Sequence, residues 1–114
     1  MSDVLDTELL QQYLDALGSE GLQQTVVTFE KVIGEYVNLM AGELNAQNEE
    51  GLRRQAHKVK GACSSLGLLV LMDDMKHLEK AEWQWPEAYE LLQQWPQKVP
   101  EHLAILKQWI AKQG

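Results

Sequence analysis

The sequence predicts an all-α protein: an antiparallel four-helix bundle with a short extra N-terminal helix and a proline-interrupted C-terminal helix. Apolar residues recur at helical spacing along most of the chain, and no stretch alternates apolar and polar residues as a half-buried strand would. With 114 residues, 45% of them hydrophobic, the chain can bury one core but is too short for a catalytic domain plus a substrate domain. We therefore expect residues 1–114 to form a single domain.

The first half of the chain contains signals for three helices. The carboxylate of Asp6 can cap a short first helix, which should end at Gly18. Ser19 can cap a second, longer helix, whose apolar stripe runs through residues 22–44 and stops before the polar segment NAQNEEG. A third helix should follow this segment and end near Gly67.

The second half contains the remaining two helices of the prediction. One should run from about Leu69 to Glu82, and the last should begin after EWQWP, where Pro86 suits a first-turn position. Pro96 and Pro100 lack the backbone donor that a helix interior uses, so we expect a break or kink around them. Four long amphipathic helices joined by short polar connections bury their apolar stripes most simply as an antiparallel bundle.

Composition narrows the class of partner and the cellular location. The net charge of −7 argues against nucleic acid or an anionic membrane as the main partner, and no apolar run approaches the length of a membrane span. The acidic start MSDVLDTELL does not resemble a signal peptide, and the single Cys63 cannot form an internal disulfide. We therefore expect a cytoplasmic protein and a monomer. Because the chain starts at Met1 and ends soon after its last helix, we also expect a stand-alone protein rather than an excised domain.

One segment, LRRQAHKVKGACSSLGL (residues 52–68), concentrates positive charge in this acidic chain. A helical wheel separates it into an apolar side and an opposite side centred on His57. The basic and small side chains around His57 are candidate contacts for a partner that carries a phosphoryl group or an acidic pocket. These candidate partner-binding residues are Arg53, Arg54, Lys58 and Ser64.

The same face raises the question of why a helix interior holds a glycine. Gly61 costs about 1 kcal/mol relative to alanine there. It lies one turn from His57, so a bulky group could approach the imidazole, and Lys60 adds positive charge nearby. Together they describe a neutral, nucleophilic histidine that can take up a phosphoryl group. A solvated basic face with a tolerated glycine explains this spacing equally well, so the residues alone leave both interpretations open.

A family resemblance bears on this choice. AHKVKGACSSLG resembles the signature of histidine-containing phosphotransfer (HPt) domains, approximately H-x-L/V-K-G, then small residues, an apolar residue and glycine. The resemblance extends from the short first helix to HLEK in the fourth, and HLAILKQWIAKQG resembles the C-terminal HPt domain of Arc-type anoxic redox sensor kinases. Cys63 and Ser64 are mild departures from the small residues that follow the glycine in the family pattern. The matching positions are His57, Val59, Lys60, Gly61, Ala62, Leu66 and Gly67.

The resemblance implies a function. HPt domains are four-helix bundles whose exposed histidine accepts a phosphoryl group from the aspartate of one response-regulator receiver domain and passes it to another. By position, His57 is the phosphoacceptor, Lys60 its charge partner and Gly61 the residue that clears access. The implied partners are receiver domains and a hybrid sensor kinase. The chain would then be a phosphocarrier rather than an enzyme, without a cofactor of its own, and Mg²⁺ is expected in the receiver.

Glu79 is a further candidate site residue. On the helical wheel it lies close to Met72 and Met75, where an unpaired carboxylate is costly. HPt domains commonly have Gln or Glu here, so the resemblance implies that Glu79 accepts from Nδ1–H of His57 and leaves Nε2 as the nucleophile. The alternative is that Glu79 lies at the solvated edge of its helix or pairs with Lys76 or Lys80.

Other classes of function fit the sequence poorly. His57, His77 and His102 lack the spacing that places two metal ligands on one helix face, so we expect no metal site. The chain has no glycine-rich phosphate loop and no proline soon after His57 of the kind that kinase dimerisation domains have. The remaining rival is a helical adaptor that is not phosphorylated and binds a receiver or kinase through the same face.

Overall fold

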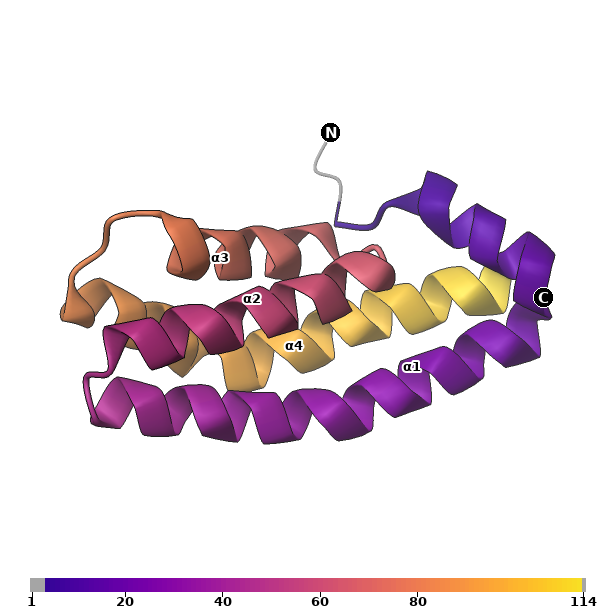
Figure 1. Cartoon of the computed structure of the whole chain (residues 1–114). Helices are drawn as coiled ribbons and strands as arrows, with labels where there is room; N and C mark the ends of the chain where they lie inside the picture. Colours follow the sequence, from indigo (N-terminus) through magenta and orange to yellow (C-terminus); the bar gives the residue numbers. More distant parts are fainter. Residues whose placement is uncertain (1–3, 114) are drawn as a thin grey trace.

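The computed structural model describes residues 4–113 and contains four helices. They are α1 (Thr7–Asn45), α2 (Glu49–Ser65), α3 (Leu69–Lys80) and α4 (Trp85–Gln113). Figure 1 shows the helices packed lengthwise as a bundle, with α2 between α1 and α3. The described residues form no strand beyond a single bridge between Leu5 and Leu68, so the predicted all-α bundle is confirmed.

The predicted extra N-terminal helix is the first part of α1. Asp6 caps it as expected, accepting a hydrogen bond from the Leu9 amide at 3.1 Å. Gly18 then leaves the helical conformation with φ 74° and ψ 169°, values that glycine adopts at little cost. The helix changes direction here, so the short N-terminal piece turns away from the long part of α1 (Figure 1).

The turn between α2 and α3 places the two helices that carry the candidate site. α2 begins behind Asn48, whose side chain accepts from the Gly51 amide at 3.1 Å, and it ends at Ser65. Gly67 follows with φ 66°, and its carbonyl accepts from the Asp6 amide at 2.8 Å. The chain thereby reverses within three residues, and α3 returns alongside α2 (Figure 1).

The structure differs from the expected helices in two details. α3 ends at Lys80, not at Glu82, because Ala81 is extended with φ −75° and ψ 159°. α4 is not broken at Pro96 or Pro100: it is one helix of 29 residues. Both prolines are exposed, so the carbonyls that lose a partner can face water, and the buried residues around them hold the helix against the core.

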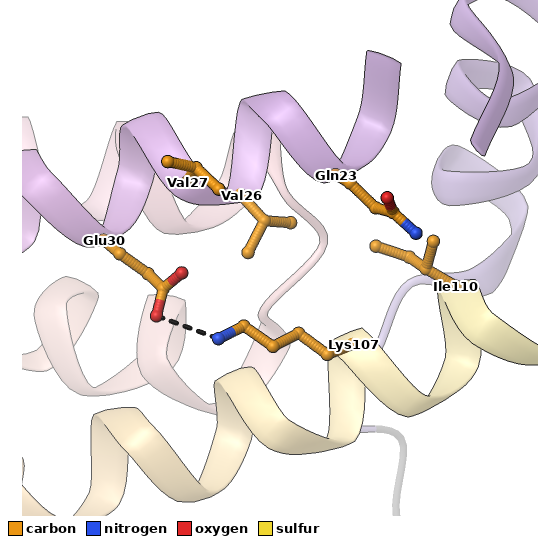
Figure 2. Close-up of a pocket in the computed structure, with 6 residues that line it drawn as sticks. All are labelled: Gln23, Val26, Val27, Glu30, Lys107 and Ile110. Carbon is orange, nitrogen blue, oxygen red and sulfur yellow. Dashed lines mark hydrogen bonds and ion pairs between the residues drawn. The ribbon is translucent and has the colours of Figure 1, made fainter. Parts of the chain in front are cut away.

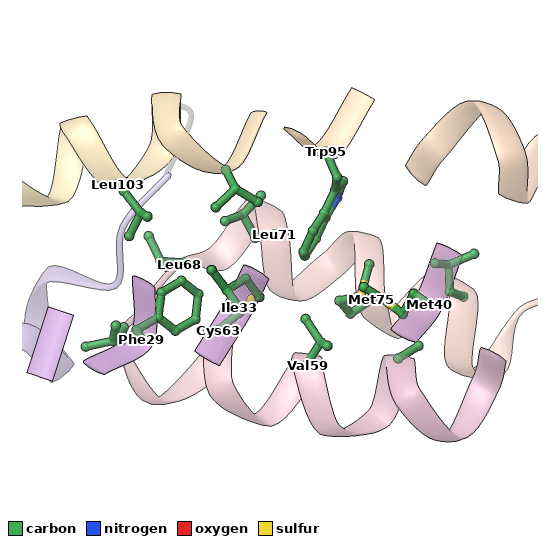
Figure 3. Packing of buried hydrophobic residues seen from close by; sticks show 14 of the residues in the cluster. Phe29, Ile33, Met40, Val59, Cys63, Leu68, Leu71, Met75, Trp95 and Leu103 are labelled. Atoms are coloured by element: carbon green, nitrogen blue, oxygen red, sulfur yellow. The ribbon is translucent and has the colours of Figure 1, made fainter. Parts of the chain in front are cut away.

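The core is a continuous apolar layer between the helices (Figure 3). It contains no buried polar or charged residue among those described. The apolar side of α2 is fully inside, which fixes the rotation of this helix and turns its other side outward. The α2 residues in this layer are Leu52, Ala56, Val59 and Cys63, with Leu66 immediately after the helix.

Candidate functional site

His57 lies in the middle of α2 on its outer side. Its side chain is 65% exposed, whereas Ala56 and Val59 beside it are fully buried. The predicted outward orientation of His57 is confirmed. An imidazole with this exposure can react with a group on another protein.

Glu79 of α3 joins His57 to Lys60. Its Oε2 lies 2.6 Å from Nδ1 of His57, and its Oε1 accepts a hydrogen bond from Nζ of Lys60 at 2.5 Å. Glu79 and Lys60 are largely covered, with side chains 17% and 22% exposed. The carboxylate therefore pairs across to α2, and not with Lys76 or Lys80 of its own helix.

The charge state of Glu79 fixes the proton on the imidazole. The hydrogen bond from Lys60, supported by that from His57, lowers the pKa of Glu79 below its usual value of 4.5 and outweighs the opposing effect of burial. An ionised carboxylate can only accept hydrogen bonds, so Nδ1 of His57 must carry the proton. In the neutral ring the lone pair is then on Nε2.

The next turn of α2 leaves room beside His57. A Cβ added to Gly61 would meet no atom within 4 Å, and both Gly61 and Ser64 are exposed. Packing within the chain therefore does not require glycine at position 61. The open space belongs to the same side of α2 as the imidazole.

The predicted partner-binding cations lie in two different environments. Lys58 is exposed, and Arg54 is 59% exposed with only a long 3.9 Å contact to Glu50. Arg53 is 25% exposed and is engaged within the chain, where its Nη1 donates to the carbonyl of Glu79 at 2.9 Å. Arg54 and Lys58 can contact a partner, whereas the Arg53 guanidinium is already hydrogen-bonded within the chain.

Sequence reasoning missed Trp83. This buried residue follows α3, and the Arg53 guanidinium carbon lies 4.8 Å from the centre of its ring. Only the i, i+4 spacing of Arg53 and His57 hinted that Arg53 belongs to the site. The contact itself crosses to a loop after another helix, which helical periodicity does not describe.

The other titratable candidates do not form a second site. His77 pairs with Glu87 at 2.6 Å, and the thiol of Cys63 is buried among apolar side chains, which raises its pKa to about 12. No three metal-ligating side chains gather anywhere in residues 4–113. Within the same residues, no helix is long and apolar enough to cross a membrane.

A separate hollow lies between α1 and α4 (Figure 2). It measures about 270 Å³ and is lined by Gln23, Val26, Val27, Glu30, Lys107 and Ile110. Its two charged residues, Glu30 and Lys107, pair with each other at 3.0 Å. None of the candidate site residues lines this hollow.

Comparisons with known proteins identify the family of this chain. The Hpt domain family model matches residues 8–109. The aerobic respiration control sensor protein ArcB of Escherichia coli, in O157:H7 and in strain K12, is 32% identical over 117 residues, which cover 96% of this chain but only 14% of each relative. The histidine-containing phosphotransfer domain of Escherichia coli ArcB matches with a TM-score of 0.88 and 28% identity, over 97% of this chain and 96% of that one. A solution structure of that domain matches with a TM-score of 0.85, over 97% of this chain and 90% of that one. The chain belongs to the Hpt domain family.

Proposed function

We propose that this chain is a phosphorelay intermediate of two-component signal transduction. His57 accepts a phosphoryl group from the phosphoaspartate of one receiver domain and passes it to the aspartate of another. The observation that carries this proposal is the exposed imidazole whose Nδ1 is held by an ionised Glu79 at 2.6 Å, which leaves Nε2 free. Family membership supports a phosphotransfer role in two-component signalling.

The transfer step is a displacement at phosphorus. The Nε2 lone pair of His57 attacks the phosphorus atom and forms an N–P bond, while the P–O bond to the receiver aspartate breaks and its electron pair leaves on the aspartate carboxylate. The proton stays on Nδ1, so the ring gains positive charge, which the Glu79 carboxylate offsets. The same atoms in reverse order deliver the group to the next receiver. In this proposal the receiver supplies the Mg²⁺, and the chain is a phosphocarrier rather than an enzyme.

In this proposal Lys60 supplies positive charge for the incoming group. A phosphoryl group carries close to two negative charges at neutral pH. Lys60 is held at the site by Glu79, and the whole chain carries a net charge of −7, so a local cation is needed to offset the repulsion. Arg54 and Lys58, both exposed, would meet the acidic edge of a receiver site.

The surface next to the site suits a protein partner. Between α1 and α2 lies a hollow of about 190 Å³ with mostly apolar walls, lined by Thr25, Thr28, Phe29, Val32, Ala62, Ser65 and Leu66. Ala62 directly follows Gly61 in α2. An apolar surface with polar residues at its edge is typical of a protein interface. We propose a cytoplasmic location for this protein, since its single cysteine cannot form an internal disulfide.

Phosphoryl uptake separates this proposal from the adaptor alternative. The protein is incubated with a phosphorylated receiver domain and, separately, with a phosphoramidate donor, and acid-labile, base-stable phosphate is measured. We expect phosphate on His57 from both donors, and none in His57→Gln. His77→Gln is the matched control, since His77 is also partly exposed and paired with a carboxylate. Receiver binding without uptake would establish the adaptor, and uptake by His57→Gln would refute the assignment.

A further inference from the structure

Arg53 makes more contacts to α3 than any predicted role for it requires. Its Nη1 donates to the carbonyls of Leu78 and Glu79, at 3.3 and 2.9 Å. Its Nε donates to Glu49 at 3.0 Å, which holds the side chain along α2. The face of the guanidinium lies over Trp83 at 4.8 Å. All these partners belong to the chain itself.

The two carbonyls are the unpaired acceptors at the end of a helix. α3 ends at Lys80 and Ala81 is extended, so the amides that would continue the helix are not available to Leu78 and Glu79. The indole Nε1 of Trp83 donates to the Leu78 carbonyl at 3.0 Å, beside Arg53. Arg53 and Trp83 thereby cap the C-terminus of α3, where a positive charge is favourable.

The capped residue is the one that holds the imidazole. Glu79 is fixed to α2 at three points: its carbonyl by Arg53, its Oε2 by His57 and its Oε1 by Lys60. These α2 residues follow one another at spacings of four and three, which places them in one row on the helix. Without Arg53, the last turn of α3 is free to fray, and the Glu79 carboxylate moves with it.

We propose that Arg53 is a positioning residue for phosphotransfer: by capping α3 through the Glu79 carbonyl, it holds the Glu79 carboxylate against Nδ1 of His57 and so keeps Nε2 unprotonated. This proposal rests on the proposed function of His57. It also replaces the expectation that Arg53 contacts the partner.

The test follows the tautomer of His57 as well as phosphoryl uptake. Ring ¹⁵N shifts are recorded by NMR at pH 8.5, where an imidazole is neutral, for the wild-type chain and Arg53→Ala. We expect Arg53→Ala to lose the preference for the Nδ1–H tautomer. It should also take up phosphate from the phosphoramidate donor about tenfold more slowly, a loss similar to that for groups that orient metal-binding histidines. Arg53→Lys, which keeps the charge and a single donor nitrogen, should restore part of both.

The neighbouring arginine provides the matched control. Arg54→Ala removes the same charge one residue away, and it should leave the tautomer unchanged because Arg54 makes no contact with α3 in the described structure. If Arg53→Ala does not fold by circular dichroism, Arg53→Met keeps the aliphatic stem over Trp83 and removes every donor. Unchanged ¹⁵N shifts in the folded variant would overturn the positioning role. Absence of phosphate in the wild-type chain would instead refute the proposed function, and the shifts would still decide the role of Arg53.

Discussion

Replacing Gly61 should raise stability and slow phosphotransfer in the same molecule. A Cβ at position 61 meets no atom within 4 Å, and the residue lies inside α2 with helical neighbours on both sides. Alanine is favoured over glycine in a helix interior by about 1 kcal/mol, so Gly61→Ala should raise the free energy of unfolding by about that amount. For a domain of 114 residues this corresponds to a Tm increase of about 4 °C.

The effect on transfer depends on the size of the new side chain. Gly61 is one turn from His57, on the side from which the aspartyl phosphate would approach Nε2 in the proposed function. A glutamine side chain there would stand between the imidazole and a receiver, and we expect Gly61→Gln to slow transfer from a phosphorylated receiver by tenfold or more, about 1.4 kcal/mol of barrier. Uptake from a small phosphoramidate should fall less, since that donor needs less room.

Gly42 provides the control for both effects. It lies inside α1, it is exposed, and a Cβ added there also meets no atom within 4 Å. Gly42→Ala and Gly42→Gln should show similar gains in thermal unfolding and wild-type rates of transfer, measured by loss of phosphate from the receiver. Normal transfer in Gly61→Gln would refute the access argument. A lower Tm in Gly61→Ala would show a packing constraint that the structure does not contain.

Four further predictions concern stability and reactivity. Gly67→Ala should lower the free energy of unfolding by about 1–2 kcal/mol in urea titrations, because φ is 66° and a Cβ would lie 3.2 Å from the Asp6 carbonyl. Cys63 should not react with a thiol reagent at pH 8 until the chain unfolds, since burial raises its pKa to about 12. Burial also lowers the pKa of His102, so the contribution of the neutral ring to the free energy of unfolding should be fully present above pH 6.5 and fall as the pH drops below it. His102→Gln should therefore reduce the loss of stability between pH 7 and 5. The pKa of Glu79 is lowered, so the contribution of its carboxylate to stability is present above the usual glutamate pKa of 4.5 and is lost on further acidification. The Tm difference between wild type and Glu79→Gln should therefore be constant above about pH 5 and shrink below pH 4.

Helical periodicity was enough to predict most of the fold, because each helix buries one stripe against a single core. The break at Gly18 and the cap at Asp6 were also readable, since both depend on the local chain. The break expected at Pro96 and Pro100 does not occur, because here packing against the core outweighs local chemistry. Local chemistry disfavours proline inside a helix, but both residues face solvent and the core contacts of the opposite face keep α4 continuous.

The site was predictable only where its residues share a helix or a family signature. The positions of His57, Lys60 and Gly61 on one side of α2 follow from their spacing. The family resemblance supplied Glu79, for which the sequence alone left a pairing within α3 open. The contacts of Arg53 could not be predicted, because its partners are backbone carbonyls and the ring of Trp83, and neither leaves a pattern in the sequence.

The presence of a carboxylate at position 79 has a consequence that an amide would not have. A glutamine offers His57 both a donor and an acceptor, so either tautomer of the imidazole can find a partner. Ionised Glu79 offers only acceptors, and Lys60 keeps it ionised by lowering its pKa. In the proposed relay, Lys60, which would offset the phosphoryl charge, thus also fixes the proton on Nδ1 before the phosphoryl group arrives. Lys60 and Glu79 therefore act as one unit, and the effects of Lys60→Ala and Glu79→Gln on uptake should not add.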